Sequence, residues 1–244
     1  MRGLIPVLAI CLLAAPAQSQ PQPDRRRVPD TMAQRLAPCL SCHGNGPGQP
    51  GADAPGAGKR RYYPRIAGKP AGYLYNQLQN FRTGRRQTPV MSWMVGPLSD
   101  AYLHEIAGWF AGQHLSSPVL DRAGLPPSEL ERGRRLVTRG DAALRVPACI
   151  ACHGERLSGA LPAVPGLVGL PRDYINAQFG AWRNGTRRAD APDCMAQIAQ
   201  RLSLLDVSAV SAWLASEALP ADPAPAPAPT RPLPLACGSM PERP

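Results

Sequence analysis

The chain has 244 residues, a formal net charge of +10 and 7 cysteines. This length accommodates one large domain or two small ones. The basic charge alone would permit nucleic-acid binding. The N-terminal sequence, however, indicates export to a compartment that offers no obvious nucleic-acid target. We therefore interpret the charge as a solubilising surface and expect no nucleic-acid partner.

The N-terminal residues 1–17 have the pattern of a secretory signal. Arg2 is followed by an apolar run and by an Ala-Pro-Ala sequence that ends at Ala17. Such a signal is too short to span a bilayer, so we expect cleavage near Ala17 and no transmembrane segment in the mature chain. Cys11 would be lost with it. Residues 18–29 are polar and rich in proline, which predicts a mobile leader.

The pentapeptide C-x-x-C-H occurs twice, at residues 39–43 and 149–153. It is the attachment sequence of a c-type haem, in which two cysteines bond the haem vinyl groups and the histidine lies under the iron. A redox dithiol would not need the histidine, and a zinc site would want a second pair of ligands within reach. We therefore predict two covalently attached haems c. Their thioether sites are Cys39, Cys42, Cys149 and Cys152, and their proximal iron ligands are His43 and His153.

Haem attachment agrees with export, because c-type haem is attached on the outer side of the bacterial inner membrane. The predicted location is the periplasm.

The first haem peptide should follow a helix that Asp30 caps and that runs to about Ala37. The Gly-, Pro- and Ala-rich residues 44–59 predict a surface loop. After it comes a segment, residues 64–84, which is repeated at residues 165–185 and contains a predicted helix. Five pairs of identical residues keep one offset between the two copies: Pro64 with Pro165, Gly68 with Gly169, Tyr73 with Tyr174, Gln77 with Gln178, and Gly84 with Gly185. An internal repeat of this kind predicts two domains of one design.

The repeat continues into a methionine followed by a Leu-Ser pair. Met91 and Met195 stand at the same distance from Ser99 and Ser203, which are predicted N-caps of helices ending near residues 112 and 219. A haem with histidine and methionine ligands is saturated and suits electron transfer. We predict Met91 and Met195 as the distal ligands, with Met94 as a rival to Met91.

The domain boundaries follow from composition. We predict a first domain at residues 30–114, a Pro- and Gly-containing linker at 115–127 and a second domain at 128–219. A capping box at Ser128–Glu131 should open the second domain's first helix, which runs to Gly140. The Pro- and Ala-rich residues 220–244 favour polyproline II and predict an arm that packs no core.

Two cysteines remain once the signal and the haem peptides are set aside, Cys194 and Cys237. In an oxidising compartment such a pair predicts a disulfide, which would fasten the arm beside Met195. The alternative is that a Cys194 thiolate ligates the second iron. His104 and His114 are interpreted as surface residues, with a bis-histidine first haem as the lesser alternative.

Residues 30–219 resemble the dihaem cytochrome c4 family. The resemblance rests on one order of motifs that occurs twice: the haem peptide, Pro-x-(Ile/Leu)-(Ala/Val)-Gly, a helix with Tyr and Gln, a methionine, and a helix that begins after Leu-Ser. The resemblance implies an all-α fold of two tandem class I cytochrome c domains, each a small helical bundle around its haem. It also implies that the carbonyl groups of Pro64 and Pro165 accept hydrogen bonds from the two proximal histidines.

The function that the resemblance implies is single-electron transfer between respiratory partners, without catalytic residues. The implied partners are a terminal oxidase or a quinol–cytochrome c reductase. Two alternatives stay open: a dihaem enzyme of the sulfur-compound dehydrogenase or peroxidase type, and an electron-transfer subunit of a larger complex.

Overall fold

The computed structural model describes residues 31–44, 63–114 and 126–240. The predicted signal, the leader, Asp30, nearly all of the loop after His43 and most of the linker lie outside these residues. Of the described helices, none is long and apolar enough to cross a bilayer.

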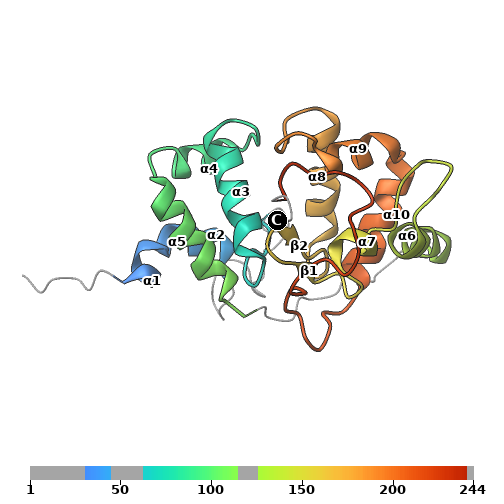
Figure 1. The fold of residues 1–244 in the computed structure, drawn as a ribbon, viewed down its shortest axis with the longest axis horizontal. Coiled ribbons are helices and arrows are strands. Elements are labelled where there is room, and N and C mark those ends of the chain that lie inside the picture. Colours follow the sequence, from blue (N-terminus) through green and yellow to red (C-terminus); the bar gives the residue numbers. More distant parts are fainter. Residues whose placement is uncertain (1–30, 45–62, 115–125, 241–244) are drawn as a thin grey trace, which may run out of the picture.

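The described helices form two groups that lie side by side (Figure 1). The first group consists of α1 (Met32–Arg35), α2 (Ala37–His43), α3 (Ala71–Arg82), α4 (Pro89–Val95) and α5 (Asp100–Ala111). The second consists of α6 (Pro127–Arg139), α7 (Ile150–His153), α8 (Arg172–Arg183), α9 (Cys194–Arg201) and α10 (Leu204–Ser216). Two short antiparallel strands, β1 (Gly159–Ala160) and β2 (Val164–Pro165), follow the second haem peptide.

Each group has its own hydrophobic core. In the first, α3 packs on α5 around Leu36, Leu74 and Leu103. In the second, α10 packs on α6 and α8 around Leu136 and Leu214. The cores share no residue, as expected for two small bundles, while the exact domain boundaries stay a prediction.

Several helix ends were predicted correctly. The Ser99 and Ser203 side chains accept hydrogen bonds from the third residue of their helices, and Asp206 completes a capping box with Ser203. Gly84 and Gly185, which follow α3 and α8, have φ values of 73° and 76°. Glycine adopts such positive values without the strain that a side chain would cause.

Two helix starts differ from the sequence prediction. At α1 the N-cap is Thr31, which forms a capping box with Gln34. At α6 the predicted capping box Ser128–Glu131 is wrong, because the helix begins at Pro127 and no side chain caps it. Proline at the first helical position has no N–H to be satisfied, so the helix can start one residue before Ser128.

A close contact between α6 and α10 runs through Gly133 of α6. A Cβ atom at this position would lie 2.1 Å from the carbonyl oxygen of Ala209 in α10, which no side-chain movement can relieve. The absence of a side chain therefore sets the separation of α6 and α10.

We expect Gly133→Ala to lower the free energy of unfolding by roughly 1 to 3 kcal/mol, because the added methyl group forces the two backbones apart. Gly180→Ala is the matched control, since Gly180 is exposed on α8 and its Cβ would meet nothing within 4 Å. Alanine there should stabilise the helix by about 0.5 to 1 kcal/mol. Urea denaturation of both variants measures the difference, and equal effects would contradict the packing argument.

Candidate haem sites

The first haem peptide forms the C-terminal part of α2, so that Cys39 and Cys42 lie about one helical turn apart. His43 follows at the last position of this helix. Its Nδ1 lies 3.0 Å from the carbonyl oxygen of Pro64. This contact leaves Nε2 as the ring nitrogen that can bind iron, and it fixes the plane of the ring. Burial lowers the pKa of His43, which favours the neutral form that ligates metals.

The second haem peptide is arranged in the same way. Cys149 precedes α7, and His153 ends it with 7% of its surface exposed. The His153 Nδ1 lies 2.8 Å from the Pro165 carbonyl oxygen. Burial lowers the pKa of this histidine as well. The two peptides thus present equivalent histidines, each oriented by the proline carbonyl that the family resemblance implied.

The rival interpretations of the two peptides fit this structure less well. Burial raises the pKa of the Cys149 thiol to about 12, whereas a redox dithiol or a zinc thiolate needs a lowered pKa. Across the described part of the chain, no group of three or more His, Cys, Asp or Glu side chains could hold a metal ion.

A cavity of about 190 Å³ lies beside the second haem peptide. Cys149, Cys152 and His153 line it together with Met195 from α9. The rest of its wall is mainly apolar and includes Leu170, Ile175, Phe179, Ile198, Val210 and Leu214. An apolar cavity with thiols, an imidazole and a thioether suits a haem, whose ring is apolar and whose iron binds nitrogen and sulfur.

In the first group, Met91 and Met94 both lie on α4 and are half-buried. Both pack against the core that Cys39 also contacts. Both methionines therefore share one hydrophobic core with the first haem peptide, and the structure does not distinguish between them. His104 and His114 are exposed, as predicted, and His104 stacks on Tyr75 with 3.7 Å between the ring centroids.

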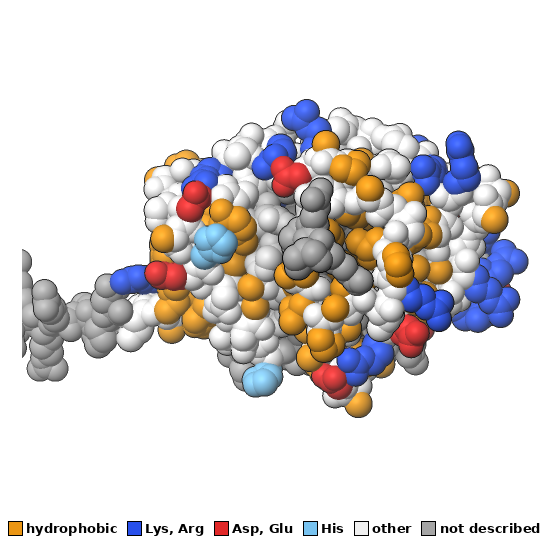
Figure 2. Space-filling view, in the orientation of Figure 1, with side chains coloured by type: hydrophobic (Ala, Val, Ile, Leu, Met, Phe, Trp, Pro, Cys, Tyr) orange, Lys and Arg blue, Asp and Glu red, His pale blue; other side chains and the backbone are white. Residues whose placement is uncertain are grey.

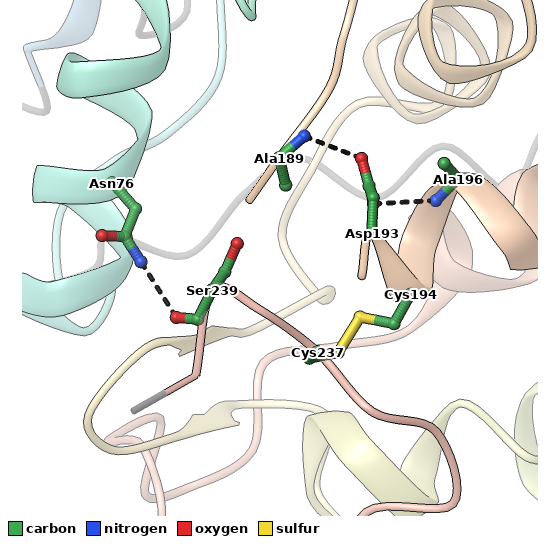
Figure 3. Close-up of a disulfide and its surroundings, with 7 residues drawn as sticks. All are labelled: Asn76, Ala189, Asp193, Cys194, Ala196, Cys237 and Ser239. Carbon is green, nitrogen blue, oxygen red and sulfur yellow. Dashed lines mark hydrogen bonds between the residues drawn. A yellow bond between two sulfur atoms is a disulfide. The ribbon is translucent and has the colours of Figure 1, made fainter. Parts of the chain in front are cut away.

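The disulfide between Cys194 and Cys237 holds the arm against the second group, with 5.1 Å between the two Cα atoms. Figure 3 shows it beside Asp193, whose carboxylate accepts hydrogen bonds from the backbone of Ala189 and Ala196. In the same view the Asn76 side chain of α3 donates to the Ser239 carbonyl at 3.0 Å, so the arm also contacts the first group.

The arm is more ordered than its composition predicted. Ala226 exchanges backbone hydrogen bonds with Gly159 and Leu161 at the edge of β1. Leu235 packs against the second core, which corrects the expectation that the arm packs none. Figure 2 shows apolar side chains gathered on the face that carries this part of the molecule. Single leucines between prolines gave no periodic signal in the sequence.

The interface between the two groups is built from the repeat. Arg86 donates to Tyr174 and Gln178 across the interface, and Arg187 donates to Tyr73 and Gln77. Lys69 also crosses it, and its Nζ donates to the Gly166 carbonyl at 2.8 Å.

Sequence reasoning missed these cations. The signal was available, because Arg86 and Arg187 continue the repeat at the same offset two residues beyond Gly84 and Gly185. Sequence reasoning also missed Met240 of the arm, which lines the second cavity.

No family model matches the chain. Among curated proteins, it is 37% identical over 223 residues to the thiosulfate dehydrogenase electron acceptor of Thiomonas intermedia, covering 90% of this chain and 95% of that protein. It is 32% identical to cytochrome c4 of Pseudomonas aeruginosa over 182 residues, covering 74% of this chain and 84% of that protein. The chain belongs to the dihaem cytochrome c4 family. Membership confirms two covalently bound haems c and electron transfer as the function class.

Solved structures agree with this assignment. Reduced cytochrome c4 from Pseudomonas stutzeri matches with a TM-score of 0.61 and 29% identity, over 75% of this chain and 95% of that one. Thiosulfate dehydrogenase TsdBA from Marichromatium purpuratum matches with a TM-score of 0.58 and 28% identity, over 72% of this chain and 39% of that one. The cytochrome c4 match confirms the predicted all-α fold of two tandem class I cytochrome c domains.

The disulfide generates a prediction about stability. We expect the Cys194→Ser/Cys237→Ser double variant to lose roughly 3 to 4 kcal/mol of unfolding free energy, because the bridge closes a loop with a sequence separation of 43 residues. Denaturant unfolding followed by tryptophan fluorescence measures this loss. Ser239→Ala serves as the control, since the backbone contact from Asn76 survives it. An unchanged midpoint in the double variant would mean that the arm's other contacts hold it.

Proposed function

We propose that this cytochrome c4 carries single electrons between redox proteins of the periplasm, that both irons have histidine and methionine ligands, and that its donor is a thiosulfate dehydrogenase. The first ligand pair is His43 with Met91, and the second is His153 with Met195. Each haem supplies the one-electron couple, and the protein supplies the ligands, the apolar surroundings and the route to partners.

The observation that carries this proposal is the second cavity, which His153 and Met195 line together. A methionine thioether on the distal side raises the reduction potential and leaves no open position for a substrate. The repeat extends the argument to Met91, which occupies the equivalent place before Ser99.

The donor is inferred from the relative in Thiomonas intermedia. That protein is named as an electron acceptor of thiosulfate dehydrogenase. The similarity spans 95% of that protein, so it includes both haem domains and the surfaces that could meet a partner. The likeness to part of the thiosulfate dehydrogenase TsdBA structure supports the same inference. A terminal oxidase is then the expected acceptor.

The principal alternative is that this protein is itself a dihaem enzyme with a Cys194 thiolate on the second iron. Such a ligand requires a free sulfur. In the structure the Cys194 sulfur is bonded to Cys237, and Met195 beside it lines the cavity. These contacts favour the carrier over the enzyme.

The ligands can be tested by comparing methionine variants of the holoprotein. We expect Met91→Ala and Met195→Ala each to remove half of the weak near-infrared band of methionine-ligated ferric haem, because each takes the thioether from one iron. Met94→Ala is the matched control for the first haem, since Met94 lies three residues away on the same helix. Loss of the band in Met94→Ala instead would reassign the first ligand.

The donor can be tested by anaerobic stopped-flow spectroscopy of the oxidised protein. With thiosulfate and a catalytic amount of thiosulfate dehydrogenase, we expect both haems to become reduced, at a rate that rises with dehydrogenase concentration. Thiosulfate alone should reduce neither haem. Turnover with thiosulfate and an artificial acceptor in the absence of dehydrogenase would support the enzyme alternative.

A further inference from the structure

The end of the arm, residues 233–240, lies along the second haem cavity, and we call it the wall segment. Its burial alternates, because every second residue from 233 to 239 is half-buried and the residues between them are exposed. In an extended chain, alternate side chains point to the same side. The half-buried residues line the cavity, and Met240 joins them there. They are Leu233, Leu235, Cys237 and Ser239.

Several contacts hold the wall segment in this place. The disulfide joins Cys237 to the residue before Met195. The next backbone N–H, of Gly238, donates to the Pro192 carbonyl at 3.0 Å. The Met240 N–H donates to the Cys237 carbonyl, also at 3.0 Å, and so turns Met240 back toward the disulfide. A hydrogen bond from α3 to the carbonyl of the residue before Met240 completes the set (Figure 3).

The segment packs backbone against backbone at Gly238. A Cβ atom there would lie 2.2 Å from the carbonyl oxygen of Ala191 and 2.7 Å from that of Asp190. Backbone atoms cannot move aside as a flexible side chain can. The wall segment therefore fits against the loop before α9 only because residue 238 has no side chain.

The first haem site is built differently. The wall segment follows the second domain and has no copy in the repeat, since the chain continues from α5 toward α6 after the first domain. On α4, Val90 and Trp93 beside Met91 are exposed. The motifs that resemble the cytochrome c4 family end at residue 219, so they do not account for this segment.

We propose that the wall segment is part of the binding site of the second haem. Leu233, Leu235 and Met240 contact the haem and exclude water and small ligands from it, while the disulfide and Gly238 hold them in place. Water stabilises the additional positive charge of ferric iron, so a haem shielded by an apolar wall has a higher reduction potential. The proposal requires the two haems and is independent of the electron donor.

The first test is a spectroelectrochemical titration of the holoprotein, resolved into two reduction potentials. Met240→Ser makes the wall polar, and Gly238→Ala displaces it without changing a residue that lines the cavity. Each should lower one potential only, the one that Met195→Ala also lowers. We expect the ferric-to-ferrous ratio of this haem at a fixed potential to rise by roughly three- to tenfold, where tenfold corresponds to about 59 mV.

Leu205→Ser is the matched control for the titration. Leu205 lies on α10 of the same domain, is 83% exposed and does not line the cavity. Its replacement removes an apolar side chain without opening the wall. Shifts no larger than the control's, or equal shifts at both haems, would overturn the proposal. An arm that only braces the fold would change the stability and leave both potentials in place.

The second test uses the unaltered protein and so does not depend on the folding of any variant. Imidazole is added to the ferric holoprotein, where it can displace a methionine ligand, and the near-infrared band of methionine-ligated haem is followed. This test rests on the ligand set proposed above. We expect half of the band to disappear at low imidazole concentration and the half of the second haem to resist. Met240→Ser should abolish this difference.

Equal loss of both halves in the unaltered protein would overturn the wall. A protein that lacks the band before imidazole is added would contradict the proposed ligand set instead, and the wall is then decided by the two potentials. Failure of the wall and failure of the ligand set are therefore distinguishable.

Discussion

The hydrogen bond from each proximal histidine to a proline carbonyl is the contact on which the rest of this structure depends. In the first domain it joins residues 21 apart in sequence, and in the second, residues 12 apart. It fixes the plane of the imidazole, and it ties the haem peptide to the segment that leads into α3 or α8. Because these two helices carry the interface tyrosines and glutamines, the same bond that orients the haem-peptide histidine also positions the contact between the domains.

The sequence predicted the chemistry of this site better than its surroundings. The haem peptides, the prolines and the serine caps follow local rules in which one or two side chains perform one geometric task. The start of α6 was placed wrongly because two local signals competed there. Pro127 and the Ser128 capping pattern both favour a helix start, and the proline prevailed.

The sequence did not reveal that two arginines lie at the domain interface. Arg86 and Arg187 looked like part of a general basic surface, because the partners that they contact in the other domain are far away in the sequence. Their like charge made them poor candidates for a contact with each other. Similarly, Leu235 packs on the second core only because the disulfide and the backbone bonds of Ala226 bring a proline-rich segment back to it. Long-range contacts of this kind leave no periodic pattern.

The repeat also shows where the two haems cease to be equivalent. Lys69 corresponds to Leu170 in the second copy, so a buried ammonium group faces the second haem's histidine loop without a counterpart at the first. Burial lowers the pKa of Lys69 to about 8, so it keeps most of its charge at neutral pH. The distal sides differ too, because the arm covers the α9 region, whereas Val90 and Trp93 on α4 are 55% and 78% exposed. The two equivalent histidines are thus placed in two different electrostatic and steric settings.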